Sequence, residues 1–237
     1  MLVAENLSKT YSKKKIVKNV TISVKNSEIV GLLGPNGAGK STSFYIISGL
    51  IRPDTGKVFF NGIDITNLSL SYRAKLGIAY LPQEISVFRG MTVQENIMTA
   101  LEIIEKNKLK REQRLEELLA QFSIEHLRFS YAISLSGGER RRLEIARCVA
   151  MKPKYILLDE PLAGIDPIAI DNLMDLIRSL KEQNIGVLIT DHNVKEALAL
   201  VDRAYILYNG SVIACDDSKN IVKNKQVRRI YLGKNFQ

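Results

Sequence analysis

The chain has 237 residues, 46% of them hydrophobic, and 34 basic against 25 acidic residues give it a net charge of +9. This composition is typical of a soluble globular protein with one large core. No stretch reaches the roughly 18 apolar residues that a membrane-spanning helix needs, and the N-terminus lacks the apolar region of a secretion signal. The isolated Cys148 and Cys215 argue against a disulfide framework and a cysteine metal site.

The positive charge does not by itself indicate nucleic-acid binding. The lysines are spread over several segments, and no aromatic residues alternate with them as a base-stacking platform requires. We therefore expect no nucleic-acid partner. An anionic membrane surface or an acidic protein surface is the more suitable neighbour for this charge.

The first third of the chain predicts strands. Residues 15–24 alternate polar and apolar, residues 28–33 form a short apolar run, and residues 56–65 form a hairpin that turns at Asn61–Gly62. After another apolar strand in 77–83, Thr92 and Glu95 form a capping box, and apolar residues then recur with helical spacing. This pattern predicts helical structure from about residue 87 to residue 150.

The last third returns to strands. The apolar runs 155–159 and 186–190 are typical of a parallel sheet covered on both faces. Between them, Asp166 caps a predicted helix that has Pro167 at its first position, and residues 204–214 form a closing hairpin. The predicted fold class is α/β, with an early antiparallel β layer and a helical insertion in the middle.

Residues 34–41, GPNGAGKS, match the phosphate-binding pattern G-x-x-x-x-G-K-[ST] between a predicted strand and a predicted helix. The glycines allow backbone N–H groups to surround a phosphate, Lys40 supplies a positive charge, and Ser41 offers a hydroxyl to Mg²⁺. We expect the nucleotide to be bound by the whole loop: Gly34, Pro35, Asn36, Gly37, Ala38, Gly39, Lys40, Ser41 and Thr42.

Polar residues follow three apolar strands, where ligands bind in open α/β sheets. Asp159 is predicted to hold Mg²⁺, directly or through water, and Glu160 to act as general base on a water. Gln83 is expected to reach Mg²⁺ or this water, and His192 to contact a terminal phosphate. In isolation, an Asp-Glu pair could be a helix cap, and a lone Gln or His is more often a surface residue.

Together these motifs resemble the ATP-binding cassettes of ABC transporters. The resemblance adds the Q-loop LPQE, the signature LSGGE, the Walker B strand YILLDEP, the D-loop AGID and the switch histidine in TDHN, and it covers essentially the whole chain. It implies one ABC ATPase domain over residues 1–237, with a P-loop NTPase (RecA-like) core and an antiparallel β subdomain in 1–86 and 151–237. Residues from about 87 to 150 would form the inserted α-helical subdomain.

The resemblance also implies ATP and Mg²⁺ as cofactors and a homodimer of cassettes. Ser136, Gly137 and Gly138 would contact the γ-phosphate of an ATP held by the second copy, through a helix that begins near Glu139. Asp166 would line the dimer interface, and Tyr11 would stack on adenine unless it is a surface hairpin residue. We expect the arginines at 140–142 to line the interface or a solvated face.

Within the family, the chain is most similar to ATPase subunits of lipopolysaccharide exporters. That similarity implies two transmembrane permease subunits, ATP-driven extraction of lipopolysaccharide toward the outer membrane, and a place on the cytoplasmic face of the inner membrane. Phe88 and Arg89 would lie in the groove that receives a permease helix, unless Phe88 is an ordinary core residue. One alternative is the ATPase of a branched-chain amino-acid importer. A DNA-associated ABC ATPase is disfavoured because no long coiled coil separates the P-loop from the signature.

Overall fold

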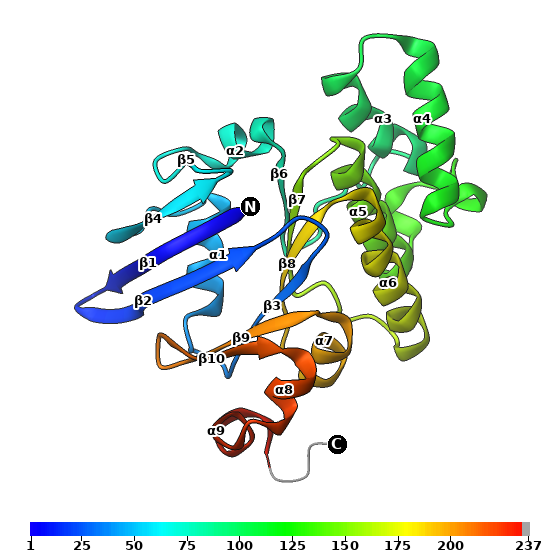
Figure 1. Ribbon diagram of the computed structural model, residues 1–237. Coiled ribbons are helices and arrows are strands. Elements are labelled where there is room, and N and C mark those ends of the chain that lie inside the picture. Colours follow the sequence, from blue (N-terminus) through cyan, green and yellow to red (C-terminus); the bar gives the residue numbers. More distant parts are fainter. Residues whose placement is uncertain (234–237) are drawn as a thin grey trace.

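The computed structural model describes residues 1–233, and the last four residues of the tail lie outside the described part. Two β-sheets enclose one helix, and further helices cover the outer face of the larger sheet (Figure 1). The smaller sheet is antiparallel, with strand order β2-β1-β4-β5. Its strands are β1 (Leu2–Tyr11), β2 (Lys14–Val24), β4 (Thr55–Phe60) and β5 (Ile63–Asp64).

The larger sheet has six strands in the order β10-β9-β3-β8-β7-β6 and is parallel except for β10. Its strands are β3 (Ile29–Leu33), β6 (Ile78–Leu81), β7 (Tyr155–Asp159), β8 (Gly186–Thr190), β9 (Arg203–Tyr208) and β10 (Ser211–Asp217). Every residue of β3, β7 and β8 is buried. Their unbroken apolar sequences follow from this position, because helices cover both faces of these strands.

Helix α1 (Lys40–Ser48) lies between the two sheets (Figure 1). Its Phe44, Ile46 and Ile47 belong to one buried cluster with apolar residues of both sheets. The opposite face of the large sheet is covered by α5 (Gly137–Ala150), α6 (Pro167–Ser179) and α7 (Val194–Leu200). The phosphate-loop helix is therefore held from two sides.

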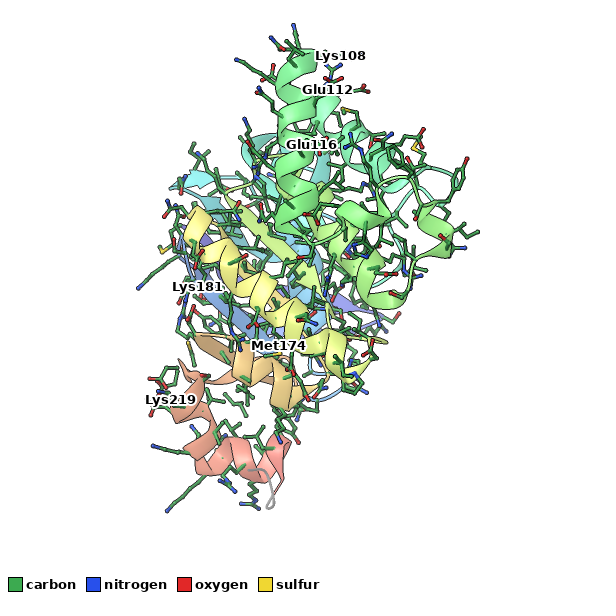
Figure 2. The ribbon with its side chains drawn as sticks, turned by 90° about the vertical axis from the view of Figure 1, so that its right-hand side faces the viewer. Lys108, Glu112, Glu116, Met174, Lys181 and Lys219 are labelled. Carbon is green, nitrogen blue, oxygen red and sulfur yellow. The ribbon has the colours of Figure 1, made fainter. Side chains whose placement is uncertain are left out.

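The middle of the chain projects from this core as α3 (Val93–Ile104) and α4 (Lys108–Gln121) (Figure 1). Figure 2 shows Lys108, Glu112 and Glu116 along the outer side of α4, far from the large sheet. The capping box of Thr92 and Glu95 is present at the start of α3. Residues 87–92 are not helical, so the predicted helical stretch is too long at its start.

The remaining elements are short. They are α2 (Leu70–Leu76), α8 (Ser218–Lys223), α9 (Lys225–Val227), the 3₁₀ helices η1 (Glu125–Leu127), η2 (Ala132–Ser134) and η3 (Leu180–Gln183), and the π-helical turn η4 (Arg228–Leu232). Of these, α8, α9 and η4 follow the last strand. Across the described 233 residues, no helix combines the length and apolar character needed to cross a bilayer.

Both predicted hairpins are confirmed, and each turns at an Asn-Gly pair. Asn61 and Gly62 join β4 to β5 with φ values of 49° and 82°, and Asn209 and Gly210 join β9 to β10 with 48° and 84°. Two consecutive positive φ values define the tight turn that matches the twist of a hairpin.

Arg73 of α2 connects α1 to the antiparallel layer. Its side chain is completely buried, and its guanidinium donates to the carbonyl oxygens of Ile46 and Ile47 at 2.8 and 2.6 Å, near the end of α1. Three more carbonyls accept from it at 2.9 to 3.0 Å, those of Ile65, Thr66 and Leu68. All five N–H groups of the side chain are therefore used.

Candidate functional site

The phosphate loop fits tightly between two strands. A Cβ atom on Gly34, where φ is 149°, would lie 2.2 Å from the carbonyl oxygen of Leu207 in β9. On Gly39, where φ is 98°, it would lie 2.8 Å from the carbonyl oxygen of Ile16 in β2. Only glycine fits at either position, so the sequence pattern reflects close backbone packing as well as room for a phosphate.

Lys40 begins α1 and is buried. Its Nζ donates to the carbonyl oxygens of Gly34 and Pro35 at 2.7 and 3.1 Å. Burial lowers the pKa of the Lys40 ammonium, and the charges of Glu160 and Asp159 partly oppose this effect. The lysine thus lies in the field of the two carboxylates at the end of β7.

Asp159 is the last residue of β7 and is buried, and its Oδ1 accepts a 2.6 Å hydrogen bond from the Thr190 hydroxyl. Burial raises the pKa of Asp159 and the neighbouring Glu160 adds to the increase, while the Thr190 hydrogen bond opposes it. Glu160 has a φ of 46°, and its N–H donates to the Thr190 carbonyl at 3.0 Å. The chain thus turns sharply at the carboxylate predicted to be the base.

The three predicted catalytic residues lie together. Gln83 Nε2 donates to Glu160 Oε2 at 2.8 Å, and His192 Nδ1 lies 3.2 Å from the same oxygen. These residues follow β6, β7 and β8, which are neighbours in the parallel sheet. The convergence arises because parallel strands end at the same edge of the sheet.

The signature begins a helix, but earlier than predicted. Helix α5 starts at Gly137, and Ser136 caps it in a box with Glu139. The backbone N–H and the hydroxyl of Ser136 donate to the Glu139 carboxylate at 2.8 and 2.7 Å. A Cβ on Gly138 would lie 3.0 Å from the Cβ of Ala169, so this glycine allows α5 to pack against the start of α6.

Asp166 and Tyr11 are both exposed at the ends of elements. Asp166 caps α6, with its Oδ1 accepting from the N–H of Ala169 at 3.1 Å, as the sequence predicted. Tyr11 ends β1, and 45% of it is exposed. The next strand contacts the phosphate loop through Ile16, so the hairpin lies against the loop without burying the ring of Tyr11.

The expectation for the three arginines is wrong for Arg141. Its side chain is buried, forms an ion pair with buried Glu144 at 3.0 Å, and donates to the carbonyl oxygen of Asp159, also at 3.0 Å. Arg141 is buried because it lies on the side of α5 that faces the end of β7. Arg140 is half-buried and lines a hollow of about 50 Å³ with Gln83, Gly137 and Glu160.

Sequence reasoning also missed Asp191, which is completely buried. Its carboxylate accepts from the N–H of Leu162 at 3.1 Å and from that of Asn193 at 2.8 Å, which ties together the loops after β7 and β8. Burial raises the pKa of Asp191. The sequence feature that could have identified Asp191 is its place directly after the apolar run 186–190.

A cavity of about 380 Å³ lies between strand β6 of the large sheet and helices α3 and α5. Phe88 lines it, is 48% exposed, and has the Arg147 guanidinium 4.6 Å from its ring centroid. The other lining residues include Tyr80, Ser86 and Ile103. Arg89 is not among the residues that line the cavity; its carbonyl oxygen accepts from the N–H of Ile133 at 3.2 Å.

A glycine-rich loop at a helix N-terminus, a lysine in that loop and carboxylates at a neighbouring strand end define a P-loop nucleoside triphosphatase. Residues 17–163 match the family model described as ABC transporter. The chain belongs to the ABC transporter family and is one of its nucleotide-binding ATPase cassettes.

Relatives match along the whole chain. The lipopolysaccharide export system ATP-binding proteins LptB of Haemophilus influenzae and Escherichia coli are both 49% identical over all of this chain and over 99% and 98% of their own lengths. An uncharacterized ABC transporter ATP-binding protein of Rhizobium meliloti is 53% identical over 99% of this chain and 87% of its own length.

Solved structures share the fold. An ATP-binding cassette of an ABC transporter in its ADP conformation superposes with a TM-score of 0.85 at 30% identity, covering 99% of both chains. A dimeric ATP-binding cassette bound to ADP and Pi has a TM-score of 0.80 at 27% identity, covering 92% of this chain and 99% of its own. These matches confirm the predicted α/β cassette fold.

Proposed function

We propose that this chain is the ATP-hydrolysing subunit of a transporter that extracts lipopolysaccharide from the inner membrane toward the outer membrane. The observation that carries the substrate assignment is the 49% identity to two LptB proteins along the entire chain. The meeting of Gln83 and His192 at the carboxylate of Glu160 supports the hydrolytic part.

The nucleotide would be ATP with Mg²⁺. Residues 34–42 surround the phosphates, with Lys40 as the fixed positive charge. The Ser41 hydroxyl, the Gln83 amide oxygen and the Asp159 carboxylate are hard oxygen ligands that suit Mg²⁺, which usually binds one or two carboxylates together with substrate phosphates. In the described part, no cluster of three His, Cys, Asp or Glu side chains could hold a metal by itself, which fits a site shared with the nucleotide. Bound Mg²⁺ would neutralise charge on the phosphate oxygens.

Glu160 would accept a proton from the attacking water, the role for which a carboxylate at hydrogen-bonding distance is suited. Gln83 and His192 lie 2.8 and 3.2 Å from Glu160 Oε2 and would keep that carboxylate turned toward the phosphate. His192 would also contact the γ-phosphate.

Two copies would enclose two ATP molecules. Each chain has one phosphate loop and one signature, so Ser136, Gly137 and Gly138 would complete the site of the second copy. Their place at the N-terminus of α5 favours contact with an anion. Asp166 would line the interface and Tyr11 would stack on adenine. The dimeric cassette of the same fold supports this arrangement.

Residues 87–150 would act as the helical subdomain within one domain of 237 residues. In each copy, the cavity beside Phe88 would receive a helix from one of the two permease subunits, with Arg89 at its margin. This would place the chain at the cytoplasmic face of the inner membrane, where a net charge of +9 suits an anionic surface.

A first experiment identifies the membrane proteins that copurify with the tagged chain and measures phosphate release by the complex with and without lipopolysaccharide. We expect stimulation by lipopolysaccharide. If branched-chain amino acids with a binding protein, or DNA, stimulated phosphate release instead, the assignment of lipopolysaccharide as the substrate would be wrong.

A second experiment tests the role of Glu160. Glu160→Gln is expected to bind ATP and to lower phosphate release by about 10²–10⁴-fold, the usual loss of a general base. The ATP-bound variant should elute as a dimer in size-exclusion chromatography. The control is Glu112→Gln, the same change on the exposed side of α4 (Figure 2). A variant that stays monomeric with ATP would contradict the assignment of Glu160.

A further inference from the structure

Three side chains of α5 connect the end of β7 to the cavity beside Phe88. Arg141, Glu144 and Arg147 are spaced three residues apart, so they lie along one side of the helix. Arg141 and Glu144 are 6% and 3% exposed. A buried charged pair costs desolvation, and it is stable only when hydrogen bonds satisfy its remaining donors and acceptors.

The first end of this row holds the backbone around Glu160. Arg141 Nη2 donates to the carbonyl oxygen of Asp159 at 3.0 Å, and its Nε donates to that of Pro161 at 3.3 Å. Its Nη1 donates to the carbonyl oxygen of Pro82 at 3.0 Å, directly before Gln83. One guanidinium thus fixes the residues that flank Glu160 and the residue that precedes Gln83.

The second end holds the segment that leads to the cavity. Glu144 Oε1 accepts from the backbone N–H of Ser86 at 2.7 Å and from its hydroxyl at 3.1 Å, while Oε2 accepts from Arg141. Arg147 Nη1 donates to the Ser86 carbonyl at 2.6 Å, and its guanidinium covers the Phe88 ring. Ser86 is therefore bound on its N–H, its hydroxyl and its carbonyl by the same helix.

We propose that Arg141, Glu144 and Arg147 form a rigid connection that transmits displacement of Gln83 and Glu160 at the nucleotide site to Phe88 in the cavity. Glu144 is the positioning residue at its centre, because one oxygen of its carboxylate accepts from Arg141 and the other accepts from Ser86. The inference rests on the proposed function, since it requires a nucleotide at Glu160 and a partner at the cavity.

The chain contains no tryptophan, so Phe88→Trp places a single fluorescent reporter beside Arg147. The emission of this protein is measured with and without a non-hydrolysable ATP analogue and Mg²⁺. Analogue binding is measured separately with a fluorescent ribose-labelled ATP. We expect the analogue to change the tryptophan emission.

Glu144→Gln is then added to the reporter protein. Glutamine has nearly the same shape and can still accept from Ser86, but its NH₂ group would face the Arg141 donor. We expect most of the emission change to be lost, while the protein still binds the analogue. Glu112→Gln in the same reporter is the matched control and should leave the emission change intact.

An undiminished emission change in folded Glu144→Gln would overturn the proposal. A reporter that binds the analogue without any emission change would overturn it too and would leave the ATPase assignment standing. Failure of the reporter protein and the unsubstituted chain to bind the analogue would overturn both. If Glu144→Gln does not fold, Ser86→Ala removes only the 3.1 Å hydroxyl bond, and a partial loss of the emission change is expected.

Discussion

Arg73 offers the sharpest test of how the phosphate-loop helix is held. A lysine ammonium has three donors, so Arg73→Lys loses at least two of the five hydrogen bonds to carbonyl oxygens, of which those of Ile46 and Ile65 keep a backbone N–H partner. At about 1–3 kcal/mol for each lost hydrogen bond to a charged side chain, the free energy of unfolding should fall by about 2–6 kcal/mol. For a chain of this length, that loss corresponds to a melting temperature lower by about 4–24 °C.

Arg73→Met removes all five donors and should lower the free energy of unfolding by about 5 kcal/mol or more, a large part of what a typical domain has. Thermal unfolding followed by circular dichroism ranks the two variants against the unsubstituted chain. Arg52→Lys, on an exposed residue, is the matched control and should melt like the parent. The reasoning is refuted if Arg73→Lys melts with the parent, or if Arg73→Met melts above Arg73→Lys.

Two further changes probe the nucleotide site and the cavity. Asp159→Asn removes a buried charge and keeps an oxygen for the Thr190 hydroxyl. It should raise the melting temperature by about 2–4 °C, for about 1 kcal/mol, while hydrolysis is lost. Because burial raises the pKa of Asp159, the parent protein gains stability as the pH falls through that raised pKa. The difference in melting temperature between Asp159→Asn and the parent should therefore be smaller at pH 5 than at pH 8. A variant that melts below the parent at pH 8 would contradict this account. Phe88→Ala should lose copurifying membrane proteins while the isolated chain still hydrolyses ATP; an unchanged yield of partners would remove Phe88 from the docking site.

Much of the fold could be predicted because its signals are local. The hairpin at Asn61–Gly62 and the helix that starts at Pro167 each depend on residues within one turn. The meeting of Gln83, Glu160 and His192 could be anticipated because each follows an apolar strand of one parallel sheet. The start of α5 could also have been predicted, because Ser136 and Glu139 have the same capping-box spacing as Thr92 and Glu95.

The buried guanidinium groups could not be predicted in this way. Arg141 binds carbonyl oxygens 18 to 59 residues away, and Arg73 binds carbonyls up to 27 residues away. An arginine in a row of three reads as a surface residue, because arginine is rarely buried unless it is paired. Only the packing of α5 against β7 shows that the middle arginine faces inward.

The contact between Gly138 and Ala169 bears on how related sequences should be read. A Cβ at position 138 would press against the Cβ of Ala169 and require a shift of a few tenths of an ångström between α5 and α6, whether or not the protein ever meets a nucleotide. A cassette that has lost hydrolysis should therefore still retain the glycine here, and the serine at 136 that caps α5 has a structural reason to remain as well. In a distant homologue, this glycine and this serine are both evidence of a preserved helix start, and neither alone indicates a working nucleotide site.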